Sequence, residues 1–154
     1  MDIRRSSSAD DPIIVEHYMA LWDSYGTPQE HYRPDAHASI AEFLRDGREH
    51  RALQTFVASI DGEAAGSAGC ELHRSPYPTV IQETYRRFGY VWHVFVRPEF
   101  QKRGIGRALT ETAIEYLRGI GCTTITLNAS EAGAPLYRSL GFATGSEMRL
   151  KLGE

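Results

Sequence analysis

The sequence predicts an α/β fold built on a mixed sheet, and three observations favour it. Apolar residues recur at helical spacing over about 10–25 and again over 36–50, and from residue 52 they recur at a spacing of two. The clearest helical pattern in the chain, at 104–120, directly follows a run that is apolar at nearly every position, at 90–96. Two helices, a hairpin and then alternating strands and helices describe a single α/β domain.

The N-terminal part is predicted to contain one strand and two helices. Residues 2–5 form a short strand, and "SSSADDP" behind it forms a turn and a helix cap. A helix from about Asp10 to Tyr25 ends at Gly26 and Pro28, and a second helix covers 36–50. The apolar positions that define these two helical faces are Ile14, Tyr18, Leu21, Trp22, Ile40, Phe43 and Leu44.

A β-hairpin follows the second helix. "ALQTFVASI" (52–60) and "AAGSAGCEL" (64–72) alternate at a spacing of two around "DGE", which is typical of a tight turn. Gly66 and Gly69 inside the second strand predict a close approach by another backbone or by a ligand. The irregular stretch 73–89 has the character of a functional loop.

The C-terminal part alternates strands and helices. "YVWHVFV" (90–96) predicts an interior strand covered on both faces. After the helix at 104–120 we expect a strand at 122–127, a short helix at 131–141 and one or two closing strands in "FATGSEMRLKL". Neither a repeat nor a linker interrupts the chain, so we expect one domain over 1–154.

The bulk composition excludes several classes of protein. Apolar and charged fractions of 42% and 24% are those of an ordinary globular protein, and a net charge of −3 gives no general attraction to nucleic acid or to an anionic membrane. No apolar run approaches the ~18 residues that span a bilayer, and the N-terminus has no signal-peptide pattern. Cys70 and Cys122 are predicted to be buried free thiols, so a cytoplasmic location is expected.

The stretch "QKRGIG" lies between the interior strand and the strongest helix. Its backbone N–H groups are therefore the unpaired donors of a helix N-terminus, which attract an anion. Glycines at 104 and 106 let a bulky anion approach the main chain, while Lys102, Arg103 and Arg107 add positive charge. The pattern predicts a phosphate or pyrophosphate site. A tight strand-to-helix turn alone would explain an isolated Gly-x-Gly equally well.

Two common phosphate motifs are absent. Nothing matches the G-x-x-x-x-G-K-[ST] loop of nucleotide hydrolases. The dinucleotide fingerprint G-x-G-x-x-G fails because Leu109 stands at its third glycine.

Three strings in order, "VFVRPEFQKRGIGRAL", "TITLNAS" and "APLYRSLGF", resemble the GCN5-related N-acetyltransferases (the GNAT family). The first contains the family's Gln/Arg-x-x-Gly-x-Gly/Ala signature, and the resemblance covers nearly the whole chain. It implies a central mixed, mostly antiparallel sheet with a splayed parallel strand pair and helices on both faces. It also implies acetyl-CoA as co-substrate, bound in the gap between the splayed strands.

The resemblance assigns cofactor contacts residue by residue. Main-chain groups of the interior strand would bind the pantetheine arm, and the helix N-terminus would bind the pyrophosphate. The family often has an asparagine seven residues before its closing tyrosine, where this chain has Ser130, with Asn128 two residues earlier. The residues implied in cofactor binding are Val94, Phe95, Val96, Lys102, Arg103, Gly104, Ile105, Gly106, Arg107, Ala108, Asn128 and Ser130.

Tyr137 is the catalytic residue that the resemblance implies, as the acid that protonates the departing thiolate. The general base stays open between Glu71, His73, Glu83, His93 and no dedicated base. Strand alternation is expected to put His93 on the face opposite to Trp92. The six histidines form no metal-binding spacing, so no metal is implied.

The leading hypothesis is an enzyme that moves the acetyl group of acetyl-CoA to a primary amine by direct attack in a ternary complex. The alternative is a non-catalytic module that senses acyl-CoA. The absence of an evident general base in the sequence favours this alternative. The resemblance implies a small amine, or a protein N-terminus or lysine, as acceptor, and a homodimer as the usual assembly. No strongly acidic loop supports a polycationic acceptor. Aromatic residues of the loops could contact the acceptor or simply pack: Trp22, Tyr25, His31, Tyr32, Tyr77, Tyr85 and Phe88.

Overall fold

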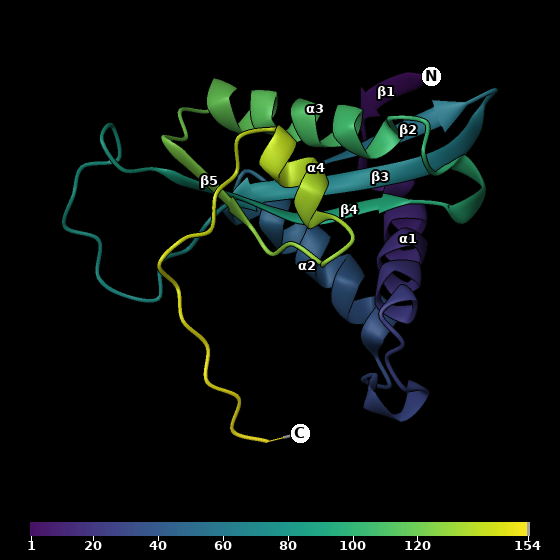
Figure 1. The fold of residues 1–154 in the computed structure, drawn as a ribbon, viewed down its shortest axis with the longest axis horizontal. Coiled ribbons are helices and arrows are strands. Elements are labelled where there is room, and N and C mark those ends of the chain that lie inside the picture. Colours follow the sequence, from purple (N-terminus) through teal and green to yellow (C-terminus); the bar gives the residue numbers. More distant parts are fainter. Residues whose placement is uncertain (154) are drawn as a thin grey trace.

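A five-stranded sheet forms the centre of the protein (Figure 1). The computed structural model describes residues 1–153, so the last residue of the predicted 1–154 domain lies outside that range. The strands lie in chain order, and neighbours are antiparallel except for β4 and β5, which are parallel. They are β1 (Asp2–Arg5), β2 (Gln54–Ile60), β3 (Glu63–Leu72), β4 (Phe88–Val96) and β5 (Thr124–Leu127). The predicted mixed, mostly antiparallel sheet is confirmed.

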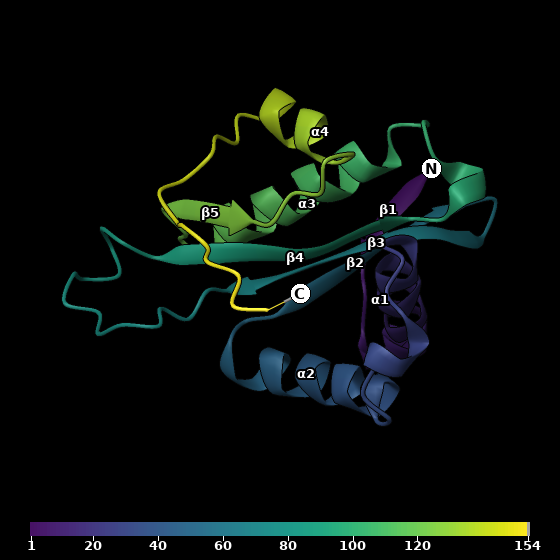
Figure 2. The same cartoon turned by 60° about the horizontal axis from the view of Figure 1, so that its bottom comes forward.

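Helices cover both faces of this sheet, as predicted. Figure 2 shows α1 and α2 on one face and α3 and α4 on the other. The helices are α1 (Asp11–Ser24), α2 (Ala36–His50), α3 (Ile105–Gly119) and α4 (Ala134–Ser139). Within residues 1–153, no helix combines the length and the apolar character that a membrane crossing requires.

Each face of the sheet has its own core. On one face, α3 buries Ile105, Leu109, Ala113 and Leu117 completely or nearly so, and their spacing of four puts them on a single helix stripe. This stripe packs against β2, β3 and β4. On the other face, α1 and α2 contribute the apolar residues Ile14, Val15, Ile40 and Leu44, which pack with Leu53 and Val57.

The two glycines inside β3 mark close approaches, as their positions predicted. A Cβ atom at Gly66 would lie 2.5 Å from the carbonyl oxygen of Phe95, on the neighbouring strand. A Cβ atom at Gly69 would lie 2.5 Å from a ring carbon of Trp92. Gly66 therefore accommodates a backbone, whereas Gly69 lets an indole ring lie against the sheet.

A bulge in β4 overturns the expected orientation of His93. Gly69 faces His93, but the next residue of β3 faces Val91, so Trp92 has no partner opposite it. The extra residue breaks strand alternation. Trp92 and His93 consequently lie on the same face, where their rings are 5.2 and 5.6 Å from the ring of Tyr18.

The predicted closing strands are not formed. Residues 142–153 contain no strand, and the alternating side chains of Met148, Leu150 and Leu152 are 94%, 84% and 91% exposed. Figure 1 shows this tail running past β5 and away from the sheet. Alternation creates an apolar face, but a strand also needs a hydrogen-bonded neighbour, and within the described chain β5 has only β4 beside it.

A buried polar cluster joins α1, β3 and β4. The hydroxyl of Ser67 lies 2.9 Å from Nδ1 of His17 and 2.6 Å from Nε2 of His93. All three residues are at most 5% exposed. Burial lowers the pKa of His17, and it lowers the pKa of His93 to about 3. Both imidazoles are therefore neutral at physiological pH.

This cluster predicts that the protein loses stability as the pH falls from 7.5 to 5.0. Below about pH 6.5 the unfolded chain binds protons that the buried imidazoles do not, so the free energy of unfolding must decrease. His93 alone accounts for about 2 kcal/mol at pH 5.0. Urea denaturation at the two pH values measures the loss.

A matched pair of variants identifies its source. His93→Gln keeps a polar group beside Ser67 but cannot titrate, so it should flatten the pH dependence. His31→Gln changes an exposed histidine in the turn after α1 and should leave the pH dependence unaltered. Equal stability of the wild type at both pH values would refute the assignment.

Candidate active site

The strands β4 and β5 part within the sheet. Their pairing runs from Phe88 opposite Thr124 to Val91 opposite Leu127 and then ends, although β4 continues to Val96. Beyond Val91, β4 keeps its hydrogen-bonded neighbour only on the β3 side. Leu127 is the last residue of β5, so the expected gap beside β4 opens where β5 ends, and within residues 1–153 no strand pairs with the main chain of β4 on that side.

The three predicted main-chain contacts lie in this unpaired part of β4. Val94 and Val96 are half-buried and pack toward α3, whereas Phe95 is 9% exposed and its ring lies 5.0 Å from that of His17. Their side chains therefore belong to the two cores. Their backbone groups are the parts that a ligand could bind, although the carbonyl of Val96 already accepts a hydrogen bond from Nε2 of Gln101 at 3.2 Å.

The N-terminus of α3 lies beside the end of β4. Gly104 occupies the position before the helix with φ of 78°, and no side chain caps the first turn. Its first N–H groups therefore have no partner within the helix. Lys102 also has a positive φ, 62°, in a conformation that is strained for a residue with a side chain. The position of this turn was predicted correctly from the sequence, whereas its two positive φ angles are seen only in the structure.

Space is available at the two glycines of the turn. A Cβ atom at Gly104 would meet nothing within 4 Å. A Cβ atom at Gly106 would lie 3.7 Å from the side chains of Val96 and Leu136, an ordinary contact distance. Packing therefore does not require glycine at 106, and the bare backbone leaves room for a bulky anion.

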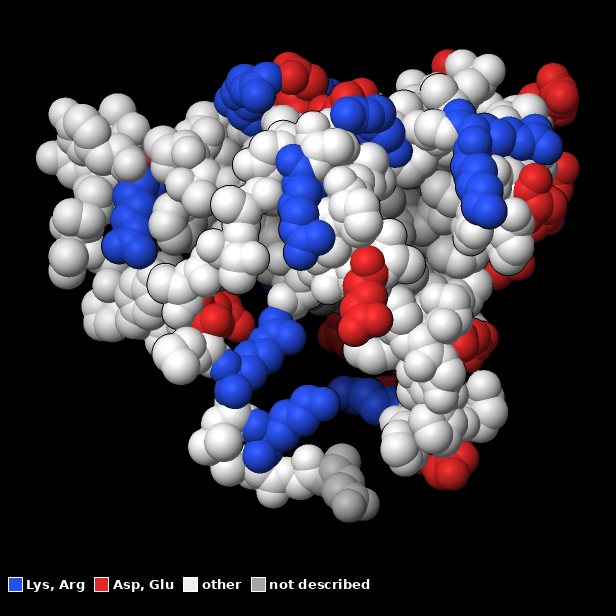
Figure 3. Space-filling model, viewed as in Figure 1, with Lys and Arg blue, Asp and Glu red and all other residues white. Residues whose placement is uncertain are grey.

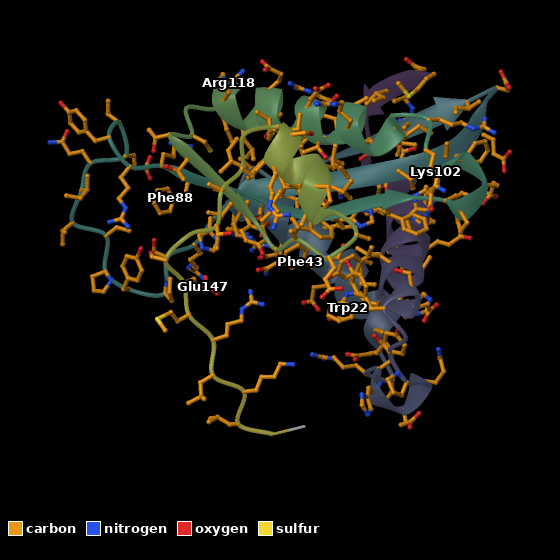
Figure 4. All side chains as sticks on the ribbon, viewed as in Figure 1. Trp22, Phe43, Phe88, Lys102, Arg118 and Glu147 are labelled. Carbon is orange, nitrogen blue, oxygen red and sulfur yellow. The ribbon has the colours of Figure 1, made fainter. Side chains whose placement is uncertain are left out.

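Positive charge surrounds the same helix end. Lys and Arg side chains gather at the right of Figure 3, where Figure 1 places the turn between β4 and α3, and Figure 4 labels Lys102 there. Arg103 donates to the carbonyl of Glu99 at 3.4 Å. Arg107 reaches Glu111 at 3.2 Å. Of the predicted phosphate-binding residues, Lys102, Arg103 and Gly104 are exposed and 106–108 are half-buried, whereas the side chain of Ile105 is buried in the core.

Tyr137 lies on α4, which covers the sheet beside α3. Its ring is half-buried and lies 6.0 Å from that of Phe142. Burial raises the pKa of its hydroxyl, and the nearby Tyr25 adds to the shift. A phenol with a raised pKa remains protonated at neutral pH, as a proton donor must.

Tyr137 is one of four phenols that approach one another from three elements. Tyr18 and Tyr25 come from α1 and its end, and Tyr90 comes from β4. Burial raises the pKa of Tyr25 and of Tyr90, and the charge of Tyr18 contributes in both cases. The Tyr90 hydroxyl also accepts a hydrogen bond from Asn128 at 2.6 Å.

Asn128 and Ser130 are engaged with the protein itself. Besides Tyr90, Asn128 interacts with Arg149 of the tail. The hydroxyl of Ser130 accepts a hydrogen bond from the N–H of Gly133 at 3.1 Å, just before α4. These two predicted cofactor contacts lie in the loop after β5, apart from the turn that precedes α3.

Two of the four candidate bases are poorly suited to the role. His93 is 1% exposed, and with a pKa of about 3 it accepts a proton only in strong acid. Glu83 lies in the loop before β4 with its side chain 78% exposed, so water keeps it an ordinary surface carboxylate.

The other two candidates lie beside Tyr90. Glu71 faces it across the β3–β4 register, and His73 stacks on its ring at 5.2 Å. Burial raises the pKa of Glu71, although Arg51 at 2.9 Å opposes the shift. A buried carboxylate with a raised pKa is a reasonable proton acceptor.

The aromatic residues suggested for the acceptor divide into two groups. Trp22 and Tyr25 lie together at the end of α1, with ring centres 5.8 Å apart. Tyr77 and Phe88 share the guanidinium of Arg86, on the loop between β3 and β4. The remaining three are His31, Tyr32 and Tyr85, at the turn after α1 and in that same loop.

Tyr18, Phe43 and Trp92 join the first group, although the sequence assigned them to the core. Trp92 lies 5.3 Å from Phe43 and 5.2 Å from Tyr18. The helical spacing of Tyr18 and Phe43 and the strand position of Trp92 matched core positions. The bulge in β4 puts the indole on the same face as His93, toward α1 and α2. The one sign of this grouping in the sequence was the number of aromatic residues in the two predicted helices.

Comparison with known proteins agrees with this geometry. Residues 14–142 match the model of the acetyltransferase (GNAT) family. The chain is 32% identical to the aminoglycoside N(6′)-acetyltransferase type 1 of Klebsiella aerogenes, covering 96% of this chain and 92% of that protein. It is 38% identical to the glucosamine 6-phosphate N-acetyltransferase of Trypanosoma brucei brucei, over 75% of this chain and 74% of that protein.

A solved structure has the same fold. The crystal structure of a predicted acetyltransferase with acetyl-CoA from Clostridium acetobutylicum superposes with a TM-score of 0.82. The alignment covers 99% of this chain and 95% of the other at 20% sequence identity.

Proposed function

This chain belongs to the acetyltransferase (GNAT) family and is an acetyl-CoA-dependent N-acetyltransferase; we propose that it acetylates a primary amine by direct attack in a ternary complex. We also propose that residues 1–154 act as one catalytic domain. The observation that carries the proposal is the splayed β4–β5 pair, which has an uncapped helix N-terminus at one end and a phenol nearby.

Acetyl-CoA supplies the acetyl group as a thioester and leaves as the free thiol. The backbone of Val94 to Val96 would hold its extended arm as an added strand is held. The N–H groups between Arg103 and Ala108, with the side chains of Lys102 and Arg107, would hold the pyrophosphate. Asn128 and Ser130 would add contacts from the loop after β5.

Two side chains would move protons. As the amine nitrogen bonds to the acetyl carbon and the carbon–sulfur bond breaks, Glu71 would take the proton from the amine, directly or through water. Tyr137 would give its hydroxyl proton to the departing sulfur. The raised pKa values of both groups support these roles.

Gly104→Ala should weaken acetyl-CoA binding. The new methyl group would meet no described protein atom within 4 Å, but it would stand where the pyrophosphate approaches the main chain. We expect the Kd from calorimetry to rise at least about tenfold, or ~1.4 kcal/mol.

Gly121→Ala is the matched control, because it adds the same methyl group at another exposed glycine with a positive φ, just after the other end of the same helix. It should leave the Kd unchanged. Wild-type affinity in Gly104→Ala would show that the pyrophosphate does not bind at this helix end.

Tyr137→Phe should lower kcat by about 10²–10⁴ while acetyl-CoA still binds, because the variant lacks the acid but keeps the ring. Thiol release from acetyl-CoA with a panel of amines measures the rate. Tyr85→Phe, at a 75% exposed tyrosine, is the control and should retain activity.

The same assay tests the proposed function. Tight binding of acetyl-CoA without thiol release on any amine, unaltered by Tyr137→Phe, would favour an acyl-CoA sensor instead.

Glu71→Gln should lower kcat/KM about tenfold to a hundredfold near neutral pH. In the wild type, the rate should fall as the pH drops through the raised pKa of Glu71, because the base becomes protonated. The variant should lack this acidic limb. The control is Glu83→Gln, and an unchanged limb in Glu71→Gln would exclude Glu71 as the base.

A further inference from the structure

Five aromatic side chains form a continuous wall on the α1–α2 side of the splayed strands. We infer that this aromatic wall binds the acceptor, and that the acceptor is an arylalkylamine, an amine joined to an aromatic ring by a short alkyl chain. The inference rests on the proposed function and names its substrate class. The wall consists of Tyr18, Trp22, Tyr25, Phe43 and Trp92.

The rings of the wall touch in sequence. Between ring centroids, Phe43 lies 5.3 Å from Trp92, and Trp92 lies 5.2 Å from Tyr18. Tyr18 lies 6.4 Å from Trp22, and Trp22 lies 5.8 Å from Tyr25. Each pair meets edge to face, at interplanar angles of 77–85°. Successive rings at right angles present faces and edges in turn, which is the geometry that a further aromatic ring prefers to pack against.

Core packing accounts for Tyr18 and Trp92, which are half-buried against the core between the sheet and the helices α1 and α2, but not for the other three rings. Trp22, Tyr25 and Phe43 are 42%, 54% and 39% exposed, whereas Ile14 and Leu44 on the same two helices are completely buried. A contiguous exposed apolar surface of this kind marks a binding site more often than a structural one.

The wall leads to the reacting groups. Tyr25 at one end is near enough to Tyr137 to raise the pKa of its hydroxyl. Trp92 belongs to β4 and lies one residue beyond Val91, the last residue that pairs with β5. A ring on the wall would therefore lie within a short alkyl chain of the gap where the thioester is expected.

Acidic and basic groups lie beside the wall. Arg51 lies over the ring of Phe43 at 4.9 Å, and its guanidinium pairs with both Asp46 and Glu71. Asp23, one residue after Trp22, accepts a hydrogen bond from the hydroxyl of Tyr32 at 2.8 Å. One guanidinium offsets one of the first two carboxylates, and a phenol does not offset a carboxylate, so a small negative charge remains beside the rings. That charge suits the single ammonium group of an arylalkylamine, and the rings suit its aromatic end.

Thiol release with matched amines tests the inference. 2-Phenylethylamine should have a kcat/KM at least tenfold higher than 2-cyclohexylethylamine, which has similar bulk without an aromatic ring. It should also exceed glucosamine 6-phosphate and an aminoglycoside, the acceptors named for the two relatives.

Variants of the wall provide a second test. Trp22→Ala should raise the KM for 2-phenylethylamine about tenfold with little change in kcat, and Trp22→Phe should restore most of the loss. Val80→Ala shortens an apolar side chain that is 88% exposed in the loop between β3 and β4 and should change neither constant. The Kd for acetyl-CoA should be the same in all three variants.

The outcomes separate the two proposals. Turnover of an aminoglycoside or of glucosamine 6-phosphate, without turnover of 2-phenylethylamine, would overturn the arylalkylamine and keep the acetyltransferase. An unchanged KM in Trp22→Ala would show that the wall does not bind the acceptor. Absence of thiol release with every amine would overturn both proposals.

Discussion

The parting of β4 from β5 after Val91 is the constraint on which the site depends. A strand inside a sheet normally satisfies its backbone groups on both sides, and leaving them unpaired in a buried place costs about 1–3 kcal/mol per group. From Trp92 to Val96 the β5 side of β4 has no strand beside it within residues 1–153. An extended ligand can supply that missing partner, which explains why a ligand arm would bind here by its backbone contacts.

The bulge at Trp92 links the gap to the acceptor face. Without the extra residue, alternation would turn either Trp92 or His93 toward α3. With it, the indole joins the aromatic wall and the imidazole joins the polar cluster with Ser67 and His17. Gly69 is part of the same arrangement, because a side chain there would collide with the indole.

The two ends of the site have different chemistry. Near α3, bare amides and cations face solvent, which suits a charged group that is held by its phosphates. Near α1 and α2, the rings suit an aromatic group, and carboxylates such as that of Glu71 lie beside them. The phenol of Tyr137 lies near the second end, on the opposite face of the sheet from α1, so the gap between the strands connects both faces.

The sequence by itself determined the elements, the order of strands and helices, and the glycine turn before α3. These depend on local periodicity and on backbone preference, which are legible in single stretches of chain. Only the tertiary structure decided the bulge at Trp92, the partners of Asn128 and Ser130, the weak basicity of His93 and the gathering of Tyr18, Phe43 and Trp92 into one surface. Each of these results from contact between segments distant in the chain. The missing closing strand has the same cause, because Met148, Leu150 and Leu152 alternate correctly but the fold brings no strand beside them.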